Sequence, residues 1–145
     1  REVLYYEPKS KKTSLKNACE YAHKMLKKRC ILFIVSDWID SGYEHSLKIL
    51  ATKNDVVALR VLDDSELELP DAGILSLQDP ETGEEVWLNS SDPKLRKAYQ
   101  EIVNTEQKNL QEFFRKCSCD YLLIRTSDSY IGALRKFFTL REKRR

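Results

Sequence analysis

The chain has 145 residues, a mass of 17.0 kDa and a formal net charge of +2, which suits one ordinary domain. Its 41% hydrophobic and 33% charged residues are typical of a soluble globular protein and exclude wholesale disorder. The longest apolar run, residues 31–35, is far shorter than the roughly 20 residues of a membrane span, and the small net charge does not point to a nucleic-acid partner.

The first half of the chain predicts a strand–helix–strand unit. Residues 14–29 place apolar side chains at helical spacing, with three basic residues in the last predicted turn. Residues 31–35 form a continuous apolar run, which predicts a strand covered on both faces in a parallel sheet. A short helix over 43–52 and a second buried strand over 55–62 follow, and the crossover between the strands should be right-handed.

The middle segment differs in charge and in pattern. Residues 63–92 carry ten acidic and no basic side chains, which predicts a protruding, solvated element. Two short apolar runs, at 74–77 and 85–88, flank a turn-rich stretch in which Gly83 suits a positive φ. This pattern predicts a β-hairpin inserted at about residues 66–90.

The last third returns to the first pattern. Asp92 and Pro93 supply a helix N-cap and first position, and a long amphipathic helix is predicted to reach residue 114. A third buried strand over 121–125 and a final helix from residue 130 complete the chain. We therefore predict an α/β fold in one domain, residues 1–145, with a mainly parallel sheet flanked by helices.

The four cysteines do not predict a metal centre. Cys19 and Cys30 are expected to be small core residues. Cys117 and Cys119 lack a second pair or a nearby histidine at zinc spacing, and reduced thiols are the default inside a cell.

Oxygen donors follow each of the three predicted strands. The ligands of parallel sheets lie off the carboxyl ends of the strands, and hard oxygen donors suit Mg²⁺. The alternative is that these side chains cap the helices that follow or are simply solvated, which we favour for Asp63, Asp64 and Asp128. Asp37 stays open between the two, because it directly follows a buried run. The donors are Ser36, Asp37 and Asp40 after the first strand, Asp63 and Asp64 after the second, and Thr126, Ser127 and Asp128 after the third.

Other chemistry is poorly represented. The four glycines are too scattered for a phosphate-binding loop, and no serine or cysteine lies in a nucleophile-elbow context. His23 and His45 fall on predicted helices beside charged residues and are expected to be solvated. No catalytic residue is therefore predicted.

Several blocks of the sequence resemble a known bacterial family. Residues 31–40 and 54–61, Leu69-Pro70 with Gly73, the turn at 79–84 and Phe137-Phe138 are similar in order and content to domain-of-unknown-function family fifty-eight, a von Willebrand factor type A-like (vWA-like) family. The resemblance covers about residues 13–140. It implies a Rossmann-like fold with an inserted hairpin.

The resemblance also implies a metal-ion-dependent adhesion site (MIDAS). Such a site combines an Asp-x-Ser-x-Ser loop, a threonine before a helix and an aspartate that ends a strand. Thr13 matches the threonine and Asp37 the aspartate, but the Asp-x-Ser-x-Ser loop has no counterpart in this chain. We therefore expect a partial Mg²⁺ site at Asp37 and Thr13, with Ser36 and Asp40 next to it as partner-binding residues.

Either the missing loop lies upstream of residue 1 or the metal site is lost. On the first interpretation, the chain is the C-terminal part of a full domain. The strand over 31–35 would then have an unpaired edge, which proteins normally cover. We expect it to be covered by a second copy in a homodimer, by residues 1–8 as a strand, or by sequence outside this chain. A stable monomer with that edge bare, observed by size-exclusion chromatography, would contradict this expectation.

The leading hypothesis is a non-enzymatic protein-interaction module, cation-dependent and cytoplasmic, that acts with a MoxR-type AAA+ ATPase, as the resemblance implies. Its parent protein would be a candidate for membrane anchoring. One alternative is a Mg²⁺-dependent phosphate-processing enzyme that uses Asp37, Asp40 and Asp63. A second alternative is a scaffold without metal.

Overall fold

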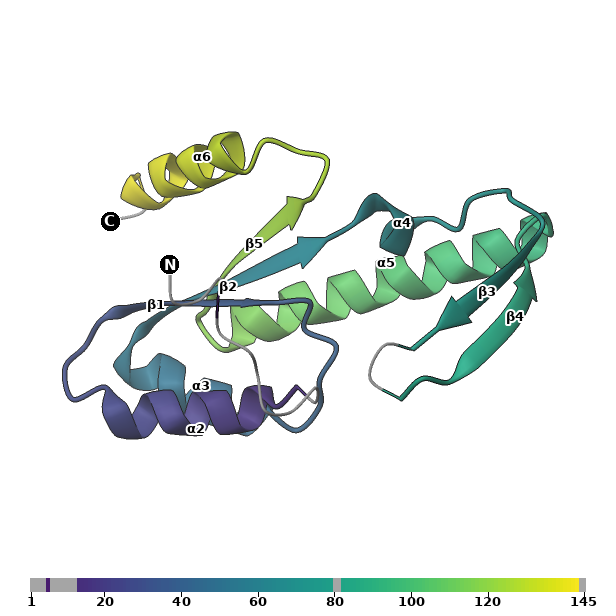
Figure 1. The fold of residues 1–145 in the computed structure, drawn as a ribbon. Helices are drawn as coiled ribbons and strands as arrows, with labels where there is room; N and C mark the ends of the chain where they lie inside the picture. Colours follow the sequence, from purple (N-terminus) through teal and green to yellow (C-terminus); the bar gives the residue numbers. More distant parts are fainter. Residues whose placement is uncertain (1–4, 6–12, 80–81, 144–145) are drawn as a thin grey trace.

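The fold is built on a three-stranded parallel sheet. A computed structural model describes residues 5, 13–79 and 82–143. The strands β1 (Ile31–Ser36), β2 (Asp55–Leu62) and β5 (Asp120–Arg125) lie in the order β1-β2-β5, and both pairs are parallel. Figure 1 shows their carboxyl ends pointing the same way. The predicted α/β class with a mainly parallel sheet is confirmed.

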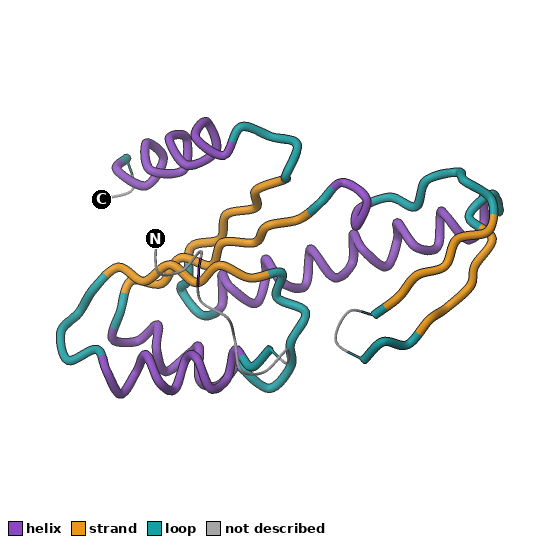
Figure 2. The backbone as a smooth tube through the Cα atoms, in the orientation of Figure 1, coloured by secondary structure: helices purple, strands orange, loops and turns teal. Residues whose placement is uncertain are grey.

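Helices cover the two faces of this sheet (Figures 1 and 2). On one face lie α2 (Leu15–Met25), α3 (Glu44–Lys53) and the long α5 (Pro93–Lys116), and on the other lies α6 (Tyr130–Glu142). A single turn, α4 (Asp64–Leu67), follows β2. Within the described part of the chain, no helix combines the length and the apolar character that a membrane crossing requires.

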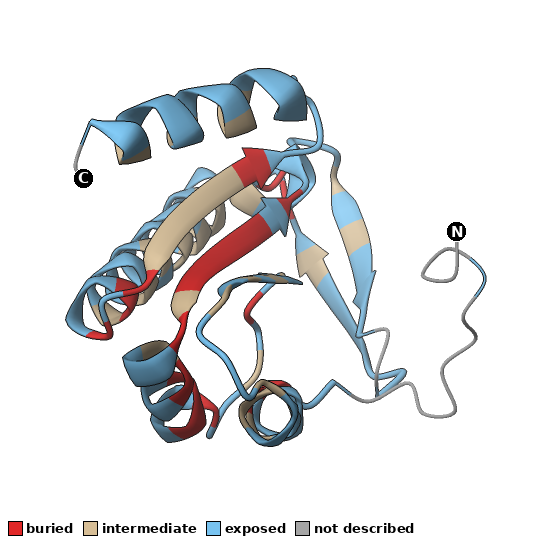
Figure 3. Ribbon diagram, turned by 90° about the vertical axis from the view of Figure 1, so that its left-hand side faces the viewer, coloured by how far each residue is buried: buried red, intermediate tan, exposed pale blue. Residues whose placement is uncertain are grey.

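The hydrophobic core lies between β2 and the face that carries three helices. Figure 3 shows the buried residues concentrated on β2 and on the elements that face it. Phe114 of α5 is fully buried, with ring centroids 4.7 Å from Trp38 and 5.3 Å from Tyr121. The cluster comprises Leu15, Cys19, Trp38, Tyr43, Leu47, Leu50, Val56, Ala58, Phe114, Cys117 and Cys119.

The strand β1 is less buried than the sequence predicts. Its exposure alternates, and Ile31, Phe33 and Val35 are 51%, 41% and 63% exposed. The expectation of a strand covered on both faces was wrong, because β1 pairs with β2 on one side and, within the described residues, ends the sheet on the other. Phe33 keeps one partner above it, the ring of Phe138 on α6 at 6.1 Å.

The first predicted helix is shorter than its sequence pattern. It ends at Met25, not Arg29, and Leu26 is already extended. The chain must return to the sheet at this point: the Cys30 carbonyl accepts a hydrogen bond from Asp55 N, and the Cys30 amide donates to Asn54 Oδ1. Cys30 is therefore only half-buried at the sheet's edge, whereas Cys19 is a core residue as predicted.

The acidic segment forms the predicted hairpin. The strands β3 (Ile74–Gln78) and β4 (Glu85–Asn89) pair antiparallel, and the turn between them is closed by hydrogen bonds from Gly83 N to Asp79 O and from Asp79 N to Glu84 O. Gly83 has a φ of 77°, which a glycine adopts without steric cost. The hairpin extends away from the three-stranded sheet (Figure 1).

The expectation that the edge of β1 is covered stays a prediction. Among the described residues β1 has one neighbouring strand, β2. Residues 1–4 and 6–8, which the sequence offers as a covering strand, lie outside the described residues.

Phe114 should be the most sensitive position of α5. A Phe114→Ala variant removes a fully buried ring that contacts three aromatic neighbours, and we expect the free energy of unfolding in urea to fall by about 3–5 kcal/mol. The matched control is Ile102→Ala on the same helix, which is 57% exposed and should cost less than about 0.5 kcal/mol. Equal losses in the two variants would contradict this placement of the core.

Candidate functional site at the carboxyl edge of the sheet

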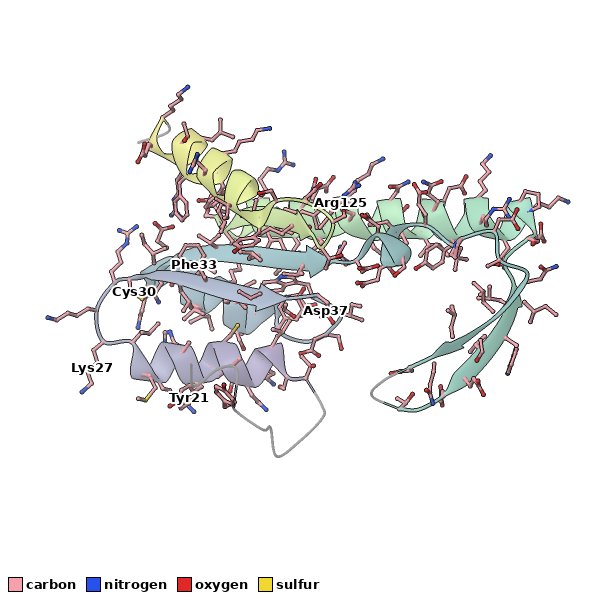
Figure 4. All side chains as sticks on the ribbon, turned by 45° about the horizontal axis from the view of Figure 1, so that its top comes forward. Tyr21, Lys27, Cys30, Phe33, Asp37 and Arg125 are labelled. Carbon is pink, nitrogen blue, oxygen red and sulfur yellow. The ribbon has the colours of Figure 1, made fainter. Side chains whose placement is uncertain are left out.

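The carboxyl ends of the strands are staggered. Ser36 at the end of β1 is in register with Arg60, while β2 continues for two residues to Leu62, which pairs with Arg125 at the end of β5. Two residues of strand correspond to about 6.6 Å. Asp63 and Thr126 therefore emerge side by side and share a hydrogen bond. Asp37 follows β1, which ends two residues earlier in the register, and Figure 4 shows it apart from Arg125 at the end of β5.

Ser36 and Asp37 build the turn that ends β1. The Ser36 hydroxyl accepts a hydrogen bond from Trp38 N at 3.1 Å and donates to Asp37 Oδ1 at 3.2 Å. The same Oδ1 accepts from Ile39 N at 3.1 Å. Oδ2 of Asp37 accepts no hydrogen bond from the described residues, so it is the oxygen that this carboxylate can offer to a ligand.

Trp38 reverses the chain at this point. Its φ of 66° lies in the left-handed region, and its indole is buried, with Nε1 donating to Leu59 O at 3.3 Å. Because Trp38 turns inward, the carboxylate of Asp37 before it stays exposed at the edge of the sheet.

Asp40 ties this turn to the start of α2. Its Oδ2 accepts a hydrogen bond from Leu15 N at 2.6 Å, and its Oδ1 accepts from Ser41 N at 2.7 Å. A carboxylate at this position complements the helix N-terminus. The contact brings the loop after Asp37 to the residue two positions beyond Thr13. The two predicted cation ligands therefore belong to segments that meet at one end of the sheet.

Asp63 is a helix cap. Its Oδ1 accepts from Ser65 N and from the Ser65 hydroxyl, its backbone N–H donates to Glu66 Oε1, and its Oδ2 accepts from the Thr126 hydroxyl at 2.6 Å. The hydrogen bonds that its carboxylate accepts, from the Ser65 hydroxyl first and then from the Thr126 hydroxyl and Ser65 N, lower the pKa of Asp63 to about 2. The interpretation of Asp63 as a cap is confirmed. Asp64 lies 3.8 Å from the Arg125 guanidinium in an exposed ion pair.

The acidic side chains of this edge are thus separated by their local bonds. Asp40 and Asp63 are engaged by helix ends, and no group of three or more His, Cys, Asp or Glu side chains within the described ranges is placed to hold a metal ion. The enzyme alternative that combines Asp37, Asp40 and Asp63 gains no geometric support. A site built from Asp37 and hydroxyl groups remains a proposal.

Sequence reasoning missed one candidate residue, Arg60. It lies on the central strand β2 and is only 8% exposed. Its side chain lines a cavity of about 400 Å³, with Trp38 and Tyr43 among the walls. The available signal was a charged residue inside the apolar run 56–62, because arginine is almost never fully buried without a partner.

Comparison with known proteins identifies the family. The family described as "Protein of unknown function DUF58" matches residues 1–109. The chain belongs to this DUF58 family. It is 29% identical over 118 residues to the uncharacterized protein Rv1480 of Mycobacterium tuberculosis, which covers 81% of this chain and 37% of that protein. It is 27% identical over 130 residues to the uncharacterized protein MAV169 of Mycobacterium avium, which covers 89% of this chain and 76% of that protein.

This DUF58 chain thus spans 37% of the length of the first of these relatives. No solved structure matches it. The resemblance proposed from the sequence is confirmed at the level of the family, whose function is not assigned.

The pKa of Asp63 gives a test of its capping role. A folded pKa of about 2, below the ordinary 3.8, means that ionised Asp63 stabilises the fold above about pH 4 and that this contribution is lost as the pH falls toward 2. We expect Ser65→Ala to raise this pKa toward 3.8, and Thr126→Val to raise it by less. The measurement is a ¹³C carboxyl NMR titration. The control is Thr105→Val, whose hydroxyl donates to Glu101 O. A pKa unmoved in Ser65→Ala and Thr126→Val would refute the cap.

Proposed function

We propose that this DUF58 chain is a non-enzymatic, vWA-like protein-interaction module that acts in the cytoplasm with a MoxR-type AAA+ ATPase. The observation that carries the interaction role is the projecting acidic hairpin with its exposed apolar side chains. A two-stranded hairpin is marginally stable by itself in water, and apolar side chains gathered on an exposed element mark interaction sites.

The two faces of the hairpin differ in character. The pairs Leu75–Leu88 and Leu77–Val86 share one face, which is apolar, and Leu77 and Val86 near the turn are 43% and 61% exposed. The other face mixes apolar and polar groups, among them the hydrogen bond from the Ser76 hydroxyl to Glu85. The apolar face is therefore the surface that a partner would cover.

Hydrogen bonds hold the base of the hairpin, which supports a role as an interaction element with a fixed direction. Ser90 is fully buried, its hydroxyl donates to Gly73 O at 2.8 Å, and it accepts from Ala72 N at 3.0 Å. Arg96 on the first turns of α5 donates to Ser90 O and pairs with Asp71 at 3.4 Å. These contacts fix the direction in which the hairpin leaves the body.

The choice of a MoxR-type ATPase as partner rests on the family resemblance. The charge of the hairpin region adds a requirement for that partner. Residues 63–92 contain no basic side chain, so the surface that receives the apolar face should be rimmed by lysine or arginine.

We propose that this chain supplies only part of the ligands of a Mg²⁺ site, which we call the half-site. Mg²⁺ takes six oxygen ligands in near-octahedral geometry. Asp37 Oδ2 and the Thr13 hydroxyl are oxygen donors of the right chemistry for Mg²⁺. Ser36 Oγ, Asp37 Oδ1 and Asp40 serve the turn and the start of α2. Asp37 and Thr13 would hold the ion together with water or with oxygens from a longer protein, and the ion would receive an acidic side chain of the partner.

The hairpin hypothesis is tested with Val86→Ser. We expect the dissociation constant for a MoxR-type AAA+ ATPase from the same genome, measured by biolayer interferometry, to rise by about tenfold or more, because an exposed apolar contact worth 1.4 kcal/mol is lost.

The matched control is Ile74→Ser, the same kind of truncation on the opposite face of the same hairpin. It should change the dissociation constant by less than about threefold. Equal effects of the two variants would contradict the role of the apolar face. Absence of binding by the unmodified chain would contradict the choice of a MoxR-type ATPase as the partner.

Calorimetry tests the half-site. We expect Mg²⁺ or Mn²⁺ to give no heat of binding with this chain alone and a measurable heat with a version extended upstream of residue 1, and Asp37→Ala in that version should abolish the heat. Asp128→Ala, after β5, is the control and should leave the heat unchanged. Absence of binding in both proteins would favour the metal-free scaffold.

A further inference from the structure

A cavity beside the carboxyl end of β1 contains a buried cation. It has a volume of about 400 Å³, within the range of small-ligand sites. The side chain of Arg60 reaches it from the central strand. The lining residues are Trp38, Ile39, Tyr43, Glu44, Arg60, Glu106, Asn109, Leu110 and Phe113.

Arg60 is largely buried and has no carboxylate partner among the described residues. It is 8% exposed, and its Nε is fully buried without a hydrogen-bond partner among the described residues. No carboxylate of the described chain lies within ion-pair distance of it. The buried hydroxyl of Tyr121 on the neighbouring strand is the polar group next to Arg60, and this contact counteracts part of the rise in the pKa of Tyr121 that burial causes. Tyr121 is neutral, so it does not balance the charge of the guanidinium. Leaving a buried charge unpaired is costly.

Three aromatic rings form one wall of the cavity. The ring centroids of Trp38 and Tyr43 are 5.5 Å apart, and those of Tyr43 and Phe113 are 5.9 Å apart. The three rings form a continuous surface that suits a flat or bulky apolar group.

We propose that this cavity binds a monocarboxylate whose charged group pairs with Arg60 and whose aromatic or bulky apolar body packs against Trp38, Tyr43 and Phe113. A guanidinium binds a carboxylate through two parallel hydrogen bonds. Here its two terminal nitrogens would donate them, because Nε is closed off from solvent. This inference is independent of the hairpin and of the cation half-site.

The acidic residues at the cavity select the charge of the ligand. Glu44 and Glu106 line the cavity and are exposed to solvent, whereas Arg60 is buried. Asp40, on the same loop as Trp38, is engaged by the start of α2. Two rim carboxylates repel a phosphate dianion more strongly than a monoanion, which favours a carboxylate over a phosphate.

Trp38 supplies the signal for the test. The chain has two tryptophans, and Trp87 on the exposed hairpin can be replaced by phenylalanine, so that the fluorescence of a Trp87→Phe protein reports on the cavity. We expect 3-phenylpropionate to change this fluorescence saturably. Its neutral amide, 3-phenylpropanamide, and inorganic phosphate should bind at least about tenfold more weakly. Equal binding of acid and amide would overturn the proposal.

Two variants locate the binding. Arg60→Gln, checked for folding by near-ultraviolet circular dichroism, should weaken binding at least about tenfold, with Arg135→Gln on the exposed side of α6 as its control. Glu106→Gln is a surface change that should strengthen binding by about two- to fivefold, with Glu101→Gln as control. An unchanged or weaker affinity in Glu106→Gln would overturn the proposal even where Arg60→Gln does not fold.

The carboxylate can come from a free small acid or from the end of a polypeptide. A peptide with a C-terminal phenylalanine and a free carboxylate, compared with the same peptide amidated, separates these sources. Tighter binding of the free-acid peptide than of 3-phenylpropionate identifies a protein terminus, and the reverse identifies a small molecule. Val86→Ser should bind these probes as the unmodified chain does, so the outcome is separate from that of the hairpin.

Discussion

The inward turn of Trp38 sets the geometry of the whole carboxyl edge. A tryptophan in the left-handed region is held against a backbone cost of about 1–2 kcal/mol, so the surrounding contacts must outweigh it. Here the indole is buried against Phe114 and Tyr43, and Nε1 donates to Leu59 O in the next strand. The residues on either side of Trp38 therefore have defined directions.

Local signals in the sequence predicted the elements whose structure depends on local chemistry. The Asp92 and Pro93 start of α5, the turn at Gly83 and the apolar run of β2 appear at the predicted positions. The exposure of β1 was not predictable in this way, because an apolar run does not reveal how many strands flank it. The early end of α2 was missed for a similar reason: it is set by the contact of Cys30 with Asn54, 24 residues away.

The candidate site was predicted less well than the fold. Parallel strands do bring their carboxyl ends to one edge, and Asp63 meets Thr126 there. Asp37 does not join them, because β1 stops two residues short of β2 in register. The sequence predicts which strands are parallel but not their stagger, and the stagger decides which oxygen donors converge. In addition, Asp63 and Asp40 accept hydrogen bonds from backbone N–H groups at the starts of helices. These bonds are favourable without any ligand.

The alternation of side chains along the sheet keeps Asp37 away from Arg60. Ser36 and Arg60 are paired in register, and side chains at paired positions share a face. Asp37 is the next residue after Ser36, so strand geometry directs it away from the face of Arg60, and the turn at Trp38 then carries the chain into the core. The nearest acidic residue in the register is thus unable to neutralise the guanidinium. A largely buried cation that lines a cavity and that its own fold leaves without a carboxylate is a stronger indication of a ligand than any cluster of exposed acidic groups, because water solvates exposed charges more fully than buried ones.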